Sequence, residues 1–286
     1  MDPQVKIIEC PRDALQGVRE FIPTAAKAAY VNALLGVGFD TVDFGSFVSP
    51  KAIPQMRDTA AVLSRLDLSE TRSKLLAIVA NTRGARDAAT FEEIDFLGFP
   101  FSVSEIFQMR NTQKTIEQSL VVLDEVLNIA AVANKKVVTY LSMGFGNPYG
   151  EPWALELVGK WTQKLTEMGV EILSLSDTIG TATPANISYL FSHLIPQYPT
   201  VEFGAHLHTS YTSWKPKVEA AFQAGCLRFD GAIQGHGGCP MANDELIGNM
   251  PTEKLLSYFA SQQIVTGTKP MAFESAYNAA LQIFSL

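Results

Sequence analysis

Short apolar runs alternate with longer segments of helical period along nearly the whole chain, and this alternation constrains the fold most. Strands that alternate with helices pair in parallel, because a parallel neighbour needs a crossover connection. Eight such units favour a closed (β/α)₈ TIM barrel over an open doubly wound sheet. The expected strands are Val5–Cys10, Thr41–Phe44, Leu75–Val79, Ile94–Phe99, Val137–Leu141, Val170–Leu175, Val201–Ala205 and Arg228–Ala232.

The segments between these strands have the features of helices with one buried face. Thr24–Leu35 and Thr115–Ala133 carry apolar residues at the i, i+3, i+4, i+7 spacing. Gly36 and Gly38 should stop the first of them, since glycine readily takes the left-handed conformation of a helix end. Pro152–Met168 is expected to have its proline in the first turn.

The chain has 286 residues, and a TIM barrel typically needs about 250. No linker or low-complexity tract divides the sequence, so residues 1–286 are expected to form a single catalytic TIM-barrel domain. Met271–Leu286 is expected to be a short C-terminal helical extension that packs on the outside of the barrel.

Composition excludes several classes of protein. Hydrophobic residues make up 47% and charged residues 18% of the chain, which is typical of a globular protein. The net charge of -7 argues against a nucleic-acid partner, and no apolar run is long enough to span a membrane. Three cysteines give no disulfide framework, and the N-terminus has no obvious signal peptide, so a cytoplasmic location is expected. Cys10 and Cys226 are interpreted as small core residues.

Polar residues gather where the expected strands end. In a TIM barrel the carboxyl ends of the strands carry the chemistry, because they all open on one rim. A core alone would not require so many polar side chains there, and their convergence predicts a site. The candidates are Arg12, Asp13, Asp43, Asn81, Ser142, Asp177, His206, His208 and Cys239 in a glycine-rich loop.

The strongest local signal is the pair His206 and His208, two residues apart on an expected strand. Such side chains point to the same side, so both imidazoles can bind one ion. A solvated strand edge that binds nothing is the alternative for an isolated match, but here Asp13 opens on the same rim. This donor set favours Mg²⁺ or Mn²⁺, whereas Zn²⁺ would more often recruit Cys239.

Arg12 and Cys239 are the candidates for steps beside the ion. Arg12 could stabilise negative charge on a carbonyl oxygen, or form a salt bridge with a rim carboxylate. Cys239 lies between two glycines and a proline, on a loop that could carry a thiol proton donor or be an ordinary turn.

Five groups of residues then follow one another in a recognisable order. They are Pro11–Gln16, Ser46–Lys51 with Pro54–Met56, Asp177–Gly180, His206-x-His208 and Gly237–Pro240. In this order they resemble the motifs of 3-hydroxy-3-methylglutaryl-CoA lyases, members of a superfamily of metal-dependent lyases and synthases built on TIM barrels. The resemblance runs from about Val5 to beyond Glu253.

The resemblance implies retro-Claisen cleavage of an acyl-CoA substrate, 3-hydroxy-3-methylglutaryl-CoA, to acetyl-CoA and acetoacetate, a reaction of leucine degradation. It also implies a homodimer. The metal ligands of these lyases match Asp13, His206, His208 and Asn249. Their catalytic residues match Arg12, which would steady the enolate, and Cys239, which would protonate it. Two further catalytic residues match Asp177, an acid, and Asp43. The residues expected to bind the substrate are Gln16, Asn81, Asn111, Ser142 and Lys51, with Lys51 or Arg110 near the CoA phosphates.

The chain departs from the lyase pattern at several positions. Asp43 stands in place of a glutamate, Thr209 in place of an aspartate, and His236 where an aliphatic residue is usual. The interval from Cys239 to Asn249 is one residue longer. The alternatives are a related Claisen-type synthase, a 4-hydroxy-2-oxoacid aldolase, a lyase for another 3-hydroxyacyl-CoA, and a barrel that binds without catalysis.

Overall fold

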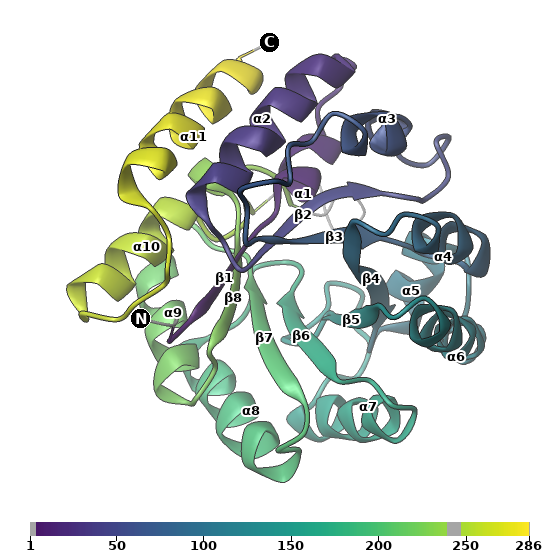
Figure 1. Cartoon of the computed structure of the whole chain (residues 1–286). Helices are drawn as coiled ribbons and strands as arrows, with labels where there is room; N and C mark the ends of the chain where they lie inside the picture. The colour runs from purple at the N-terminus through teal and green to yellow at the C-terminus, as the bar shows by residue number, and fades with distance from the viewer. Residues whose placement is uncertain (1–3, 239–246, 286) are drawn as a thin grey trace.

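A computed structural model of the chain describes residues 4–238 and 247–285, and its strands close into one parallel barrel (Figure 1). Each strand pairs with the next along the chain, and β1 pairs with β8. The TIM-barrel prediction is confirmed, with each strand within a few residues of its expected place. The strands are β1 (Lys6–Glu9), β2 (Thr41–Ser46), β3 (Lys74–Ile78), β4 (Ile94–Ser102), β5 (Lys136–Ser142), β6 (Ile172–Asp177), β7 (Glu202–Leu207) and β8 (Arg228–Gly231).

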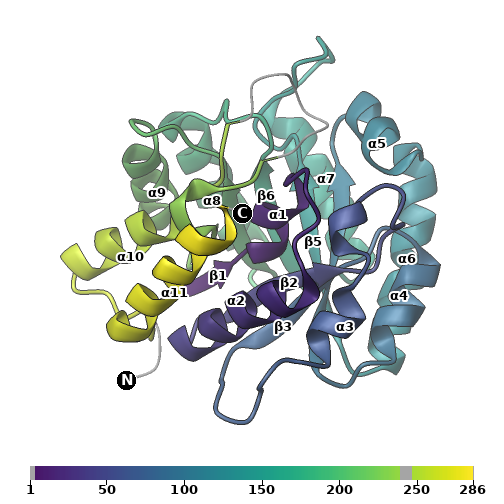
Figure 2. The ribbon, with the colours of Figure 1, turned by 90° about the horizontal axis from the view of Figure 1, so that it is seen from above.

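The helices form a layer outside the barrel, as Figures 1 and 2 show. Apolar residues of the strands and helices fill the space between the two layers, and this forms the main core. The helices are α1 (Pro11–Gln16), α2 (Thr24–Val37), α3 (Thr59–Leu63), α4 (Thr82–Ala89), α5 (Glu105–Thr112), α6 (Ile116–Val132), α7 (Leu155–Glu167), α8 (Pro184–Gln197), α9 (Trp214–Gln223), α10 (Thr252–Ser261) and α11 (Pro270–Ile283), with short 3₁₀ turns at Pro54–Met56 and Ile233–Gly235.

Two predicted helix ends were wrong. Gly36 lies inside α2, and Gly38 alone ends it, with a positive φ of 82° that favours glycine. Pro152 lies before α7, whose N-cap is Ala154, so the proline is not in the first turn. By contrast, α6 begins as expected, because Thr115 and Gln118 form a capping box that satisfies free backbone N–H groups.

The C-terminal helix α11 packs against α2, and the two lie side by side in both views (Figures 1 and 2). The rings of Tyr30 and Phe284 meet edge to face with centroids 6.1 Å apart, and those of Phe39 and Phe273 do so at 6.4 Å. The predicted C-terminal extension is therefore confirmed. No helix among the described residues is both long and apolar enough to cross a membrane.

A smaller apolar cluster fills the barrel interior near the amino ends of the strands. It consists of Leu76, Phe96, Val138, Tyr140 and Ile172. Ile78 packs against this cluster, which fills part of the barrel interior with apolar side chains.

Glu9, at the end of β1, is a fully buried carboxyl group that ties two later segments to the barrel. It accepts hydrogen bonds from the Ile233 backbone N–H at 3.0 Å and from the Thr252 hydroxyl at 2.5 Å. Burial raises the pKa of Glu9 to about 8, although both hydrogen bonds oppose the shift. The folded protein therefore holds this proton at neutral pH.

This buried acid predicts a pH dependence of stability. The folded-state pKa lies above the unfolded value of 4.5, so the contribution of Glu9 is complete below pH 4.5 and is lost as pH rises towards 8. Glu9→Gln mimics the protonated form, so the free energy of unfolding of this variant should decline less with rising pH, by on the order of 1–3 kcal/mol. Urea unfolding of the unsubstituted protein and of Glu9→Gln between pH 5 and 8.5 measures this difference. Parallel curves for the two proteins would contradict the prediction.

Candidate functional site

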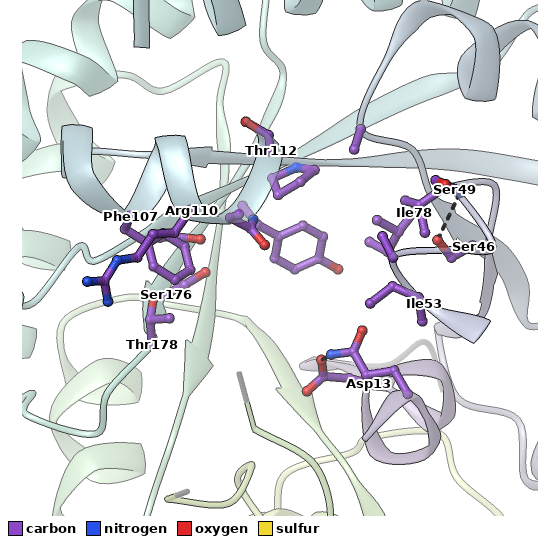
Figure 3. A pocket seen from close by; sticks show the side chains of 18 of the residues that line it. Asp13, Ser46, Ser49, Ile53, Ile78, Phe107, Arg110, Thr112, Ser176 and Thr178 are labelled. Carbon is purple, nitrogen blue, oxygen red and sulfur yellow. Dashed lines mark hydrogen bonds between the residues drawn. The ribbon is translucent and has the colours of Figure 1, made fainter. Parts of the chain in front are cut away.

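A pocket of about 800 Å³ opens at the carboxyl ends of the strands. Arg12, Asp13, His206 and His208 line it together with residues of β2 to β6 and of the segments that follow β2, β3, β4 and β6. In Figure 3, Phe107 and Arg110 of α5 lie on one side of this pocket, and Ser46 and Ile53 lie on the other. The rim on which the sequence predicted a site is therefore hollow, and polar side chains form part of its lining.

Asp13, His206 and His208 each offer a ligand atom, and these atoms lie within 4.8 Å of one another. The first turn of α1 carries Asp13 into the pocket, and β7 supplies His206. Burial opposes a charge on Asp13, but Arg12, His206 and the hydrogen bond from Asn249 outweigh it and lower the pKa of Asp13. An anionic carboxylate beside two imidazoles is a donor set that fits a divalent ion.

The charge of His208 and its hydrogen bonding are both compatible with a metal ligand. Burial and the neighbouring His206 lower the pKa of His208 to about 3, so its imidazole is neutral at physiological pH. Its buried Nδ1 has no hydrogen-bond partner among the residues that the structure describes. A neutral, buried imidazole with an unpaired nitrogen is suited to bind a metal ion, and otherwise costs free energy.

His206 is oriented by Asp230 of β8, whose carboxylate Oδ2 lies 3.1 Å from His206 Nδ1. Burial opposes a charge on His206, but Asp230 outweighs it and raises the pKa of the imidazole. A carboxylate behind a ligating histidine fixes its tautomer and makes it a better ligand. The other ring nitrogen, Nε2, is then the one available to a metal ion in the pocket.

Asn249 joins this cluster from the segment after residue 246. Its Nδ2 donates to Asp13 Oδ2 at 2.5 Å and to the carbonyl of His236 at 2.9 Å. A backbone bridge between His208 and Asn249 brings the two segments together. The structure thus gathers all the residues predicted as metal ligands. Cys239 lies outside the described residues.

Arg12 is held by acidic and amide groups on two sides. Its Nε and Nη2 donate to Asp43 Oδ2 at 3.0 and 2.6 Å, and its Nη1 donates to Asp13 and Gln16, both at 3.0 Å. Burial disfavours its charge, yet Asp43 and Asp13 raise its pKa, so it stays cationic. The shorter side chain at position 43 therefore reaches Arg12. One N–H of Nη2 has no protein partner among the described residues.

Asp177 does not line the pocket. Ser176 and Thr178 do, and since alternate side chains on a strand face opposite sides, Asp177 faces the helix layer. Its carboxylate accepts from Lys217 of α9 at 2.6 Å, and Lys217 also donates to the carbonyl oxygens of His208 at 2.8 Å and Gly180 at 3.0 Å. Asp177 is thus linked to a candidate metal ligand through Lys217.

The residues predicted to bind substrate all line the pocket: Gln16, Lys51, Asn81, Asn111 and Ser142. Some are also structural. Asn81 caps α4 by accepting from the Gly84 N–H at 2.8 Å, and Gln16 donates to Asp13 at 2.7 Å. Besides Arg12, the cations Lys51, Arg110 and Lys114 line the pocket.

The chain is similar in sequence to a known protein family over almost its whole length. A model of the HMGL-like family matches residues 4–279. The chain belongs to the HMGL-like family. This HMGL-like enzyme is 34% identical over 267 residues to the mitochondrial hydroxymethylglutaryl-CoA lyase of Bos taurus, a match that covers 92% of this chain and 81% of the bovine protein. It is also 34% identical to a hydroxymethylglutaryl-CoA lyase of Bacillus subtilis, with coverage of 91% and 86%.

Solved structures agree with this assignment of the HMGL-like chain. The crystal structure of the Bacillus subtilis HMG-CoA lyase matches with a TM-score of 0.89 and 33% identity, over 97% of this chain and 92% of that one. An HMG-CoA lyase from Acinetobacter baumannii, in complex with coenzyme A and 3-methylmalate, matches with a TM-score of 0.90 and 26% identity, over 98% and 91%.

Three residues of this HMGL-like site were not singled out from the sequence. Asp230 and Tyr140 point into the barrel from within β8 and β5, and Lys217 reaches the site from α9. The alternation of Arg228 and Asp230 in an otherwise apolar strand was the available signal, since both face the interior. Nothing local in the sequence indicated that Lys217 would be buried.

Proposed function

We propose that this HMGL-like enzyme cleaves 3-hydroxy-3-methylglutaryl-CoA to acetyl-CoA and acetoacetate. One observation carries the proposal. A buried guanidinium with a free N–H lies beside the cluster of Asp13, His206 and His208 in a pocket that also carries cations. Cleavage next to a thioester needs both a site that activates a hydroxyl group and a cation that stabilises an enolate.

The reaction balances without any further reagent. The hydroxyl group on C3 loses its proton, and the C2–C3 bond breaks as C3 becomes the ketone of acetoacetate. The bonding electrons pass to C2 and the thioester oxygen, which gives the enolate of acetyl-CoA. A proton added at C2 completes acetyl-CoA. The enzyme has to bind two oxygens of the substrate, stabilise one anion and supply one proton.

Arg12 is the residue that we propose for the enolate oxygen. Asp43, Asp13 and Gln16 hold its guanidinium in place, and the unpaired Nη2 N–H remains to donate to the substrate. A fixed donor of this kind needs no reorganisation when charge develops, and one such donor is worth about 10²–10³ in kcat. Cys239 remains the predicted donor of the proton to C2.

Asp13, His206, His208 and Asn249 would hold a divalent ion, for which we propose Mg²⁺ or Mn²⁺. When bound, it would coordinate substrate oxygens and make the hydroxyl easier to deprotonate. Within the chain, Asp230 orients His206, and Gln16 and Asn249 orient the carboxylate of Asp13. We propose that Asp177 acts on this cluster by positioning Lys217, which holds the backbone of His208.

The cations Lys51, Arg110 and Lys114 are where we propose that the CoA phosphates bind. The pocket lining extends from Asp13 to Phe107 and Arg110 of α5 (Figure 3), and we propose that the acyl-CoA lies along it. Asn111, in the same helix, offers an amide near them. The homodimer, the single domain and the cytoplasmic location remain predictions.

Arg110→Ala is expected to raise KM for the acyl-CoA about tenfold with little change in kcat, because a phosphate contact away from the reacting carbon binds substrate and transition state alike. Steady-state kinetics at two salt concentrations measure this, and the difference should shrink at high salt. Lys136→Ala is the control, since Lys136 pairs on the surface with Glu171. An unchanged KM would place the phosphates elsewhere.

The substrate is tested by an acetoacetate assay across a panel of 3-hydroxyacyl-CoA esters, with and without chelator. We expect turnover of 3-hydroxy-3-methylglutaryl-CoA that chelator abolishes and that Mg²⁺ or Mn²⁺ restores. Faster metal-dependent cleavage of another ester would keep the reaction and replace the substrate. No cleavage of any ester by folded, metal-loaded protein would overturn the proposal.

A further inference from the structure

A second group of potential ligands lies inside the barrel, next to the one already described. Cys10, His206 and Asp230 each offer an atom, and these atoms lie within 4.8 Å of one another. Cys10 is 1% and Asp230 is 2% exposed, and neither lines the pocket. We call these three residues the inner cluster. It contains a thiol, an imidazole and a carboxylate. The cluster of Asp13, His206, His208 and Asn249, which we call the pocket cluster, contains no sulfur among the described residues.

Polar atoms around the inner cluster lack partners. Asp230 Oδ1 and the hydroxyl of Tyr140 are both buried and make no hydrogen bond among the described residues. The Cys10 thiol has only a long contact, 3.9 Å, to the carbonyl oxygen of Ile8. Unsatisfied buried polar groups are costly, and several together indicate a ligand that would satisfy them.

The surroundings of the inner cluster favour a cation. The carboxylates of Asp230, Asp43 and Asp13 all act electrostatically on the Cys10 thiol, so they lie near enough to attract a divalent ion to it. Such an ion can displace the thiol proton. Arg228, on the same strand as Asp230, has its Nη1 3.5 Å from a carboxylate oxygen of Glu202, and its Nε and Nη2 make no hydrogen bond among the described residues.

We propose that Cys10, His206 and Asp230 form a buried site for a thiophilic divalent ion such as Zn²⁺, with the Tyr140 hydroxyl or a water as fourth ligand. Sulfur, nitrogen and oxygen donors at the corners of a tetrahedron are typical of Zn²⁺. Mg²⁺ and Mn²⁺ prefer oxygen donors and would stay in the pocket cluster. The inner site is thus distinct in its chemistry from the site of the proposed reaction.

The two clusters share His206, and this makes them mutually exclusive. Nδ1 faces Asp230, so the pocket ion depends on Nε2. A neutral imidazole binds a metal through one nitrogen and keeps a proton on the other. An ion in the inner site would take Nδ1, move that proton to Nε2 and release the thiol proton of Cys10 to solvent. A thiophilic ion would therefore remove His206 from the pocket cluster and displace Mn²⁺.

Co²⁺ is the probe for the thiolate, because only a Co²⁺–sulfur bond gives an intense near-ultraviolet charge-transfer band. Chelator-treated protein with one equivalent of Co²⁺ should show this band. We expect Cys10→Ser to abolish it, whereas Cys226→Ser and Cys239→Ser should retain it. Near-ultraviolet circular dichroism and thermal unfolding of Cys10→Ser confirm that the variant folds. No band in the unsubstituted protein, or a band that disappears only in Cys239→Ser, would overturn the proposal.

Competition between ions is a second measurement that needs no substrate, so it stands apart from the proposed reaction. One equivalent of Zn²⁺ should release the bound Mn²⁺. The electron paramagnetic resonance signal of free Mn²⁺ measures this release. In Cys10→Ser we expect the affinity for Zn²⁺ at this site to fall by more than about 100-fold, since even outer-shell losses cost 10–100-fold. Equal release of Mn²⁺ by Zn²⁺ from both proteins would contradict the inner site.

Discussion

Asp13→Ala should lower kcat/KM for carbon–carbon cleavage by at least about 10³-fold and abolish binding of the divalent ion that we propose for the pocket, since a bound ion is worth several kcal/mol in the transition state. Asp13 is the only carboxylate of the pocket cluster, and its two oxygens also accept from Arg12 and Asn249. Removing it takes away the negative charge that attracts the ion and also leaves Arg12, Gln16 and Asn249 without a hydrogen-bond acceptor. Metal analysis after gel filtration and the acetoacetate assay measure both effects.

Asp67→Ala is the matched control for this substitution, because Asp67 is an exposed aspartate whose carboxylate is hydrogen-bonded to Ser69 among the described residues. It should change neither metal content nor turnover. The decisive comparison is the metal content. If Asp13→Ala retained one tightly bound Mn²⁺, the pocket cluster would not be the metal site, whatever happened to the activity.

That Asp13, His206 and His208 lie together could be predicted from the sequence because two simple rules apply to them. His206 and His208 are two apart at the end of an apolar strand, so they face the same side, and residues after β1 open on the same rim as β7. Neither rule depends on the helices outside the barrel. The strands were predicted for the same reason, since their apolar runs are short and regularly spaced.

For Asp177, the position at the end of a strand was not enough to predict which side its side chain faces. It comes at the end of β6, as a rim residue should, but Ser176 and Thr178 face the pocket and Asp177 faces α9. Applying the alternation of β-strand side chains at this position would have separated rim residues that face inward from those that face outward. The alternation needs an accurate strand end, and β6 runs two residues beyond its expected limit of Leu175.

Lys217 could not have been found from the sequence at all. It lies in a helix with Lys215 and Glu219 close by, a setting typical of a solvated surface. Its burial depends on how α9 packs beside the end of β6, which is a tertiary relation. Helix ends are similarly decided by tertiary packing, and α2 continues through Gly36 because the next turn still packs on the barrel, with Val37 fully buried.

Lys217→Met should reduce the free energy of unfolding by about 3–5 kcal/mol, because it leaves the buried carboxylate of Asp177 without its counter-charge. Burial already raises the pKa of Asp177, and Lys217 opposes that rise. Without the lysine the pKa of this carboxyl rises further. The loss of stability should therefore be largest at high pH and shrink as the pH falls and Asp177 becomes protonated. Urea unfolding between pH 5 and 8 measures the trend.

The double variant Asp177→Asn with Lys217→Met separates the charge effect from packing. It removes the uncompensated charge, so it should be more stable than Lys217→Met alone and should lose the pH dependence of the deficit. Lys136→Met is the control, because the pair of Lys136 and Glu171 is exposed and such pairs contribute about 0–1 kcal/mol. Lys217 also holds the carbonyl of His208, so both Lys217 variants should bind Mn²⁺ more weakly, by about tenfold. A stability loss no larger than that of Lys136→Met, with unchanged Mn²⁺ affinity, would show that the pair neither stabilises the barrel nor positions His208.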